Sequence, residues 1–171
     1  MKKTNIKEMP FFYDRYIDLV SENETVLEAL SSSQNILEEL KESLIQQQDY
    51  QYQEGKWTPK DILQHLIDTE RIMSYRALTL ARGEQQELIG FEEQKYAQHT
   101  NAGSRSVEDL LQEFSLVRKS TLALFKSFSD EMLLREGICS GIHVSPLIFG
   151  CICVGHVQHH VNVLHERYFT K

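Results

Sequence analysis

Apolar residues recur every three or four positions along most of this chain, the spacing that places side chains on one face of an α-helix. The pattern predicts a short opening helix over residues 10–19, begun by Pro10, and a longer helix over residues 26–47. The polar segment QQQDYQYQEGK then separates this second helix from the next apolar stripe.

Three further helices have clear start signals. Those over residues 58–82 and 145–168 each begin with a hydroxyl residue followed by proline, which supplies a cap and a suitable first backbone angle. The helix over residues 106–128 begins at Ser106, and Gly83 can end the helix before it. Each has an apolar stripe that can pack into a shared core.

The remaining segments are connections. Residues 83–105 predict a long loop with a short turn at FEEQKYA, and a connection of that length inside a domain is uncommon unless it is functional. The connector SDEMLLREGICSGIHV shows no convincing strand. The pattern therefore predicts an all-α protein: a four-helix bundle with a long crossover loop and short accessory helices, forming a single domain over residues 1–171.

Composition narrows the class of protein. The apolar share of 41% and the charged share of 25% are ordinary for a soluble domain. The formal net charge of −7 argues against a general nucleic-acid binder. The amino-terminal residues lack the apolar core of a signal peptide, and no long apolar run predicts a membrane span. We expect a cytoplasmic protein with a small-molecule substrate, no nucleic-acid or membrane partner, and an open possibility of a homodimer.

The cysteines predict little chemistry. Cys139, Cys151 and Cys153 make an odd count without a secretion signal, which favours reduced thiols. A Cys-x-Cys next to histidines can indicate a soft-metal site, but residues two apart on a helix point about 200° away from each other. Buried, unreactive cysteines are the better interpretation.

Three histidines carry the main chemical signal. His156 and His160 are one helical turn apart, so their Cβ atoms lie roughly 6 Å from each other on one face. His65 lies far upstream, on the inward stripe of another predicted helix. Three imidazoles on one ion leave a coordination position open for water or substrate, which is typical of catalytic metal sites.

The other histidines fit this site less well. His159 and His165 point away from the pair on their helix, although His159 could lie beside the site or at the surface. His99 lies in the long loop and could swing toward the site, and His143 belongs to the connector.

The segments GKWTPKDILQHLIDTERIMSYRAL and GHVQHHVNVLHERYF resemble the DinB-like metal-binding four-helix-bundle superfamily. In that family a Trp-Ser/Thr helix start precedes the first ligand histidine, and an H-x-x-x-H on the last helix supplies two more. Trp57, Thr58 and His65 match the first element, and His156 and His160 match the second. The resemblance implies a bundle whose central cavity holds a divalent ion, usually zinc or nickel.

The same resemblance suggests a reaction. Family members with established activities are mostly transferases and isomerases that use bacillithiol, mycothiol or glutathione, and others are classed as metal-dependent hydrolases. We therefore expect a metal-dependent S-transferase for a low-molecular-weight thiol of the bacillithiol kind. The alternatives are a metal-dependent hydrolase, a non-catalytic metal-binding or stress-response module, and a dimerisation scaffold that binds no metal.

Further residues are candidates for roles in such a reaction. Asp68 follows His65 by one turn and could act as a base, although a salt-bridge role is equally plausible. Arg76 could anchor a carboxylate on a thiol cofactor. Glu92, Tyr96 and His99 in the long loop could line the way in for a substrate.

Overall fold

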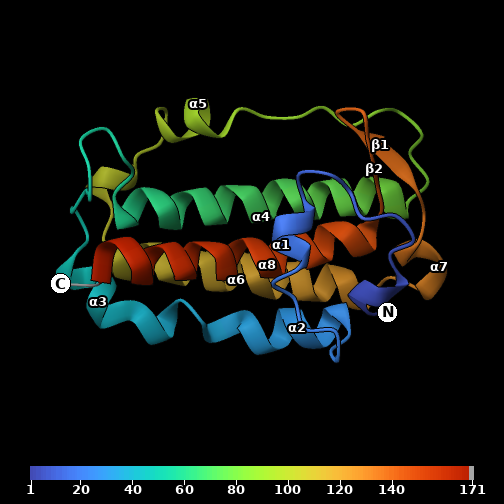
Figure 1. The fold of residues 1–171 in the computed structure, drawn as a ribbon, viewed down its shortest axis with the longest axis horizontal. Helices are drawn as coiled ribbons and strands as arrows, with labels where there is room; N and C mark the ends of the chain where they lie inside the picture. Colours follow the sequence, from blue (N-terminus) through green and yellow to red (C-terminus); the bar gives the residue numbers. More distant parts are fainter. Residues whose placement is uncertain (170–171) are drawn as a thin grey trace.

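The computed structural model describes residues 1–169 and shows a bundle of four long helical segments (Figure 1). Three of these segments are single helices: α4 (Pro59–Ala81), α6 (Val107–Lys126) and α8 (Pro146–Leu164). The first segment is a series of short helices, α2 (Val26–Ser32) and α3 (Lys41–Gln46), with 3₁₀ turns between them. The predicted all-α bundle is confirmed.

The directions of the helices explain the long crossover. In Figure 1, α4 and α6 run the same way, whereas the first segment and α8 run the opposite way. The 23 residues of α4 span about 34 Å, so the chain must travel back over that distance before α6 can begin. Residues 83–105 make this return above α4 and carry the short helix α5 (Glu93–Ala97), at the position of the predicted turn.

The prediction of one continuous helix over residues 26–47 is wrong. The Ser33 hydroxyl donates to the Ala29 carbonyl at 2.7 Å, which competes with the main-chain hydrogen bonds of a regular helix. Arg118 from α6 donates to Ser33 Oγ at 2.6 Å and to the Leu30 carbonyl at 3.4 Å. The break in the helix therefore supplies acceptors for a buried arginine.

The opening helix is shorter than predicted. Phe12 has a φ of 78°, which is incompatible with a right-handed helix through that residue, so α1 covers only Asp14–Ile17. The helix crosses α8 at Gly155, where an added Cβ would lie 1.8 Å from the Tyr16 carbonyl oxygen. Glycine at this position lets the two backbones touch.

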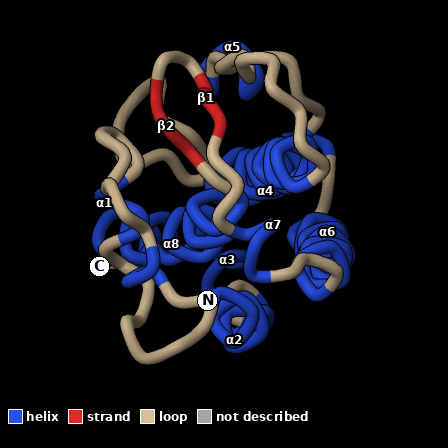
Figure 2. The backbone as a smooth tube through the Cα atoms, turned by 90° about the vertical axis from the view of Figure 1, so that its right-hand side faces the viewer, coloured by secondary structure: helices blue, strands red, loops and turns tan. Residues whose placement is uncertain are grey.

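The connector contains a hairpin that the sequence pattern missed. Strands β1 (Gly137–Cys139) and β2 (Ile142–Val144) pair antiparallel after the short helix α7 (Asp130–Leu133), and Figure 2 shows them at one end of the bundle. Ser140 and Gly141 form the turn with φ values of 50° and 76°, as a type I′ turn requires. Strands of three residues are too short to show alternation, so only the Ser-Gly pair could have signalled them.

A polar layer lies between two apolar halves of the core. Arg118 is fully buried and donates to both carboxylate oxygens of Glu70 on α4, each at 2.8 Å. The same guanidinium donates to the Cys153 carbonyl on α8 at 3.0 Å. With its contacts to the first segment, Arg118 joins all four parts of the bundle.

Within residues 1–169, one stretch is long and apolar enough to cross a membrane by length and composition alone. This stretch is Pro146–Phe169, with a mean hydropathy of 1.3 over its most apolar window. Of that window, 72% is buried inside the protein, as expected for the central helix of a bundle.

Candidate metal centre

The start of α4 directs His65 into the bundle. The Thr58 hydroxyl accepts from the Asp61 amide at 3.2 Å, and the Asp61 carboxylate accepts from the Thr58 amide at 2.9 Å. This capping box fixes the first turn and hence the faces of the helix that follow it. His65, two turns later, is only 6% exposed and lies on the side facing α8, as the periodicity predicted.

The other two histidines of the cluster come from α8. His156 is 3% exposed, and His160, one turn further on, is partly exposed. Nε2 of His156 lies 3.0 Å from Nε2 of His65 and 3.2 Å from Nε2 of His160. The three histidines expected to share a site therefore converge, and we call them the histidine cluster.

The geometry of the histidine cluster fits a shared cation. Nitrogens about 2.1 Å from one ion lie about 3.0 Å apart at a right angle and about 3.4 Å apart at the tetrahedral angle. Without a cation, the Nε2 atoms of His65 and His160 would both have to hydrogen-bond to the single Nε2 atom of His156. Otherwise one of these two short contacts would have no hydrogen bond. A divalent ion satisfies all three nitrogens at once.

The protonation of the cluster suits ligation as well. Burial, and to a smaller extent the positive charge of neighbouring histidines, lowers the pKa of His65 to about 4 and that of His160 to about 3. The same causes lower the pKa of the fully enclosed His156 well below its usual value. All three imidazoles are therefore neutral near pH 7, the form that binds metals.

Residues around the cluster hold the rings in place. Thr69 Oγ1 lies 3.4 Å from His65 Nδ1, so it can accept that proton when Nε2 faces an ion. The Trp57 ring lies 4.7 Å from the His65 ring, and the Tyr168 hydroxyl donates to the Trp57 carbonyl at 2.6 Å. Sequence reasoning missed Thr69, although its position one turn after His65 was a usable signal.

The short helix α1 covers the cluster from another side. Its Tyr16 ring packs edge-on against His156, with 5.1 Å between ring centroids, and against His159 at 5.4 Å. His159 is half-buried beside the cluster, which agrees with one of the two positions expected for it. The contacts of Tyr16 depend on the close approach at Gly155 and could not be inferred from spacing.

Two cavities reach the cluster, and each is lined by different histidines of it. The first cavity has a volume of about 440 Å³ and is lined by His156, Arg76 and residues of α1 and the crossover. The second cavity has a volume of about 300 Å³ and is lined by His160, His159 and Trp57. Gln94 of α5 lines both cavities.

Comparison with known proteins now places the chain in a family. Residues 28–164 match the family model of the DinB superfamily. The chain belongs to the DinB superfamily. The resemblance drawn from the histidine spacing and the Trp-Thr helix start is therefore confirmed.

A solved structure supports the DinB fold. The chain is similar to YfiT from Bacillus subtilis, described as a probable metal-dependent hydrolase with an unusual four-helix bundle topology. The two share 18% sequence identity with a TM-score of 0.67, over 90% of this chain and 84% of that one. Comparison with curated proteins gave no significant match.

Besides Arg76, four candidate residues of this DinB domain lie at another hollow, although Glu92 also lines the first cavity. Asp68, Glu92, Tyr96 and His99 line a third hollow of about 470 Å³ between α4 and the crossover. Burial raises the pKa of the Asp68 carboxyl, and the Gln64 amide donates to it at 3.0 Å. Among residues 1–169, no hydrogen bond joins Asp68 to the histidine cluster, so its action as a base stays a prediction.

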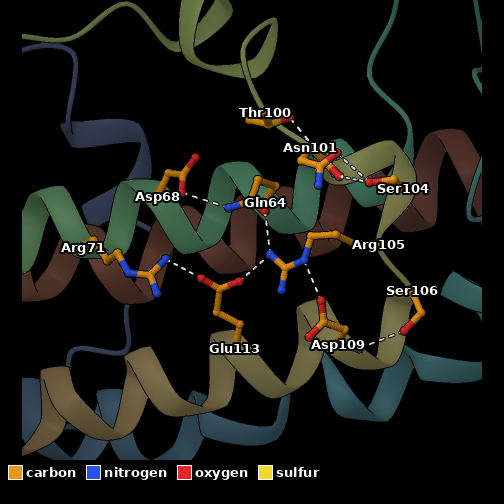
Figure 3. A network of polar contacts seen from close by, with 11 residues as sticks. Gln64, Asp68, Arg71, Thr100, Asn101, Ser104, Arg105, Ser106, Asp109 and Glu113 are labelled. Carbon is orange, nitrogen blue, oxygen red and sulfur yellow. Dashed lines mark hydrogen bonds and ion pairs between the residues drawn. The ribbon is translucent and has the colours of Figure 1, made fainter.

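A polar network beside Asp68 fixes the end of the crossover (Figure 3). Arg105, just before α6, donates to Gln64 on α4 at 2.8 Å and to Asp109 on α6 at 2.6 Å. It also pairs with Glu113, which Arg71 of α4 contacts at 2.6 Å. The sequence left a salt bridge as the alternative role for Asp68, but the ion pairs among residues 1–169 at this place belong to Arg71 and Arg105 and do not include Asp68.

The remaining predictions concern cysteines and other histidines. All three cysteines are buried and free, and burial raises the pKa of Cys151 to about 12. The predicted burial of the three cysteines is confirmed, and their low reactivity stays a prediction. His143 lies exposed on β2, and His165 begins the π-helical turn His165–Phe169.

Proposed function

We propose that this DinB protein is a metal-dependent S-transferase that joins a low-molecular-weight thiol of the bacillithiol kind to an electrophilic small molecule. The observation that carries the proposal is the pair of cavities. His156 lines one and His160 lines the other, so two reactants can approach one histidine cluster from different sides. A hydrolase, whose second reactant is water, has no need of a second cavity.

His65, His156 and His160 would hold a divalent ion, with zinc and nickel the best candidates for a site of neutral imidazoles. When bound, such an ion lowers the pKa of a thiol or water that it coordinates. The protein supplies the positions of the three rings, through Thr69 at His65 and through Tyr16 at His156.

The residues of the two cavities would bind and orient the reactants. In the reaction, the thiol sulfur bonds to the electrophilic carbon, the leaving group departs with the bonding electrons, and the thiol proton passes to the solvent. The second cavity presents His159, Lys56 and the ring of Tyr52, which suit a polar thiol. The first has more apolar walls, including Met73, Phe91 and Ile152. Gln94 on α5 lies between the two reactants.

Metal-dependent hydrolysis is the second candidate. YfiT, which shares the fold, is described as a probable metal-dependent hydrolase. With water in place of the thiol, the same neutral histidine cluster would support hydrolysis of an ester or amide bound in the first cavity.

A panel of reactions separates these candidates. Protein purified without a histidine tag is stripped with a chelator, reloaded with zinc, nickel or manganese, and assayed with bacillithiol, glutathione or cysteine against chlorodinitrobenzene. We expect metal-restored conjugation with one of the thiols. Metal-restored turnover of an aryl ester without thiol would favour the hydrolase. Failure of every substrate with fully loaded protein would favour a non-catalytic metal-binding module.

A further inference from the structure

Arg76 and Arg118 are both buried, but their surroundings differ. Arg118 has a carboxylate partner, Glu70, and further acceptors on every neighbouring segment. Arg76 is 3% exposed, and its hydrogen bonds go to the Ile89 carbonyl at 2.7 Å and to the sulfur of Met73 at 3.8 Å. Arg76 forms no ion pair in the part of the chain that the structure describes.

A buried cation without an anion is costly for a folded protein. Burial of a charge is normally offset by an ion pair or a full set of hydrogen bonds, and Arg118 has both. The acceptors of Arg76 are a carbonyl, a thioether sulfur and the Tyr13 hydroxyl, so at least two of its five N–H groups lack an acceptor among residues 1–169. The incomplete set of partners points to an anion that binds to Arg76 from outside the protein.

Arg76 lies in the wall of the first cavity, which leads to the histidine cluster. On α4, Thr69, Met73 and Arg76 line this cavity at intervals of four and three residues, so they share one face of the helix. From Thr69, which contacts His65, to Arg76 the helix rises by about 10 Å. The cavity therefore extends from the cluster to the guanidinium over the length of a small molecule.

The rest of the wall fits an apolar body with one anionic end. Tyr16 lies beside His156, and Phe91 lies near Arg76, whose guanidinium carbon is 5.7 Å from the ring centroid. The Tyr13 phenol is next to Arg76: burial raises its pKa, and the charge of Arg76 partly offsets that rise.

Two acidic residues, Glu92 and Glu93, line the first cavity, and neither forms an ion pair with Arg76 within residues 1–169. Burial raises the pKa of the Glu93 carboxyl, and Arg15 partly offsets the rise. Arg76 is not among the charges that shift the pKa of Glu93. Within residues 1–169, neither glutamate therefore supplies an ionic partner for Arg76.

We propose that Arg76 binds the carboxylate of the electrophilic substrate, whose aromatic or aliphatic body lies along Phe91 and Tyr16 and whose reacting group lies at His156. This names the substrate class for the proposed function and rests on it: an apolar monocarboxylic acid rather than a neutral or cationic compound. Guanidinium groups bind carboxylates through two parallel hydrogen bonds, which also fixes the direction of the substrate. The carboxylate expected earlier on the thiol belongs, in this assignment, to the other reactant.

Binding of a carboxylate probe tests the assignment without catalysis. Phenylbutyrate and its neutral match, phenylbutyramide, are titrated calorimetrically into chelator-treated protein, so that the acid cannot bind a metal instead. We expect the acid to bind at least tenfold more tightly than the amide. Arg76→Gln should remove this difference, and Arg76→Lys should keep part of it. Arg82, an exposed arginine directly after the end of α4, is the matched control, and Arg82→Gln should keep all of the difference.

The melting temperatures of the variants show whether a loss of binding results from unfolding of the protein. Because Arg76 lacks an ionic partner, Arg76→Gln should melt within a few degrees of the unchanged protein by circular dichroism. Equal binding of acid and amide, or an acid preference that survives Arg76→Gln, would overturn the assignment. A third outcome would also overturn it: Arg76→Gln melts at a much lower temperature, and Arg76→Lys binds the acid and the amide equally well. Arg76 would then have a structural role only.

The outcome for the anion site can be separated from that for catalysis. Acid binding that depends on Arg76 without any metal-dependent turnover would uphold the anion site and overturn the S-transferase. Metal-dependent conjugation in which Arg76→Gln raises KM for the thiol but not for a carboxylate electrophile would uphold the S-transferase. It would overturn the assignment of Arg76 to the electrophile.

Discussion

Arg118→Met would remove a guanidinium that contacts all four segments of the bundle and would leave the Glu70 carboxylate buried without its partner. Breaking a buried pair from one side costs about 3–5 kcal/mol, because the remaining charge is uncompensated. The acceptors Ser33 and Cys153 also lose a charged donor. We expect the free energy of unfolding to fall by about 4–5 kcal/mol, a large part of the roughly 5–15 kcal/mol typical of a domain.

The double variant Glu70→Leu/Arg118→Met is the informative comparison. Removing both charges leaves no buried ion, and apolar replacements of buried pairs are often neutral or stabilising. The unsatisfied acceptors should still cost about 1 kcal/mol each. We therefore expect the double variant to be more stable than Arg118→Met alone, with a coupling energy between the two sites of at least about 2 kcal/mol.

Urea unfolding followed by circular dichroism at pH 7 measures these free energies from the transition midpoint and its slope. Arg71→Met provides the control, since Arg71 pairs with Glu113 at 2.6 Å but is half exposed, and it should cost under about 1 kcal/mol. If the effects of Glu70→Leu and Arg118→Met simply add, the two side chains do not act as a buried pair and the reasoning fails.

Three further substitutions and one labelling reaction test the site and its supports. His65→Ala and His160→Ala should each lose the bound divalent ion by elemental analysis yet stay helical, whereas His143→Ala keeps it; unfolding of either would make the cluster structural. Gly155→Ala should displace α1 and lower the melting temperature by several degrees, because the new Cβ meets backbone 1.8 Å away; an unchanged melt would contradict the contact. Cys151, whose pKa is raised to about 12, stays a thiol across pH 7–9, so iodoacetamide labelling of the folded protein should be slow and nearly independent of pH there; rapid labelling that rises with pH would contradict its burial.

The sequence predicted those features that depend on local signals. The Thr58-Pro59 and Ser145-Pro146 pairs begin α4 and α8 where the structure has them. Once those two helices are in place, a fixed number of residues per turn sets the direction of each histidine. The convergence of the cluster therefore followed from two caps, the helical period and the assumption that α4 and α8 pack together.

The features that were missed depend on contacts between distant residues. At the break near Ser33, Arg118 from another helix donates to the Leu30 carbonyl, which a continuous helix would use, and to the Ser33 hydroxyl. The place of Tyr16 follows from a backbone contact at Gly155, and propensity carries no information about that contact. Arg76 is buried, unlike an ordinary surface arginine, because the crossover covers it. Hydrophobic periodicity does not predict the path of a loop.

The histidine cluster joins residues that are 91 positions apart in the sequence. Contacts between positions so far apart are slow to form in folding, because a long stretch of chain must be ordered before they contribute. During synthesis, the cluster cannot exist until the last helix has left the ribosome and docked on α4. Ion capture by the three rings would therefore report that the chain has been made as far as α8 and that α8 has docked on α4, and a product that ends before His156 would lack two of the three rings.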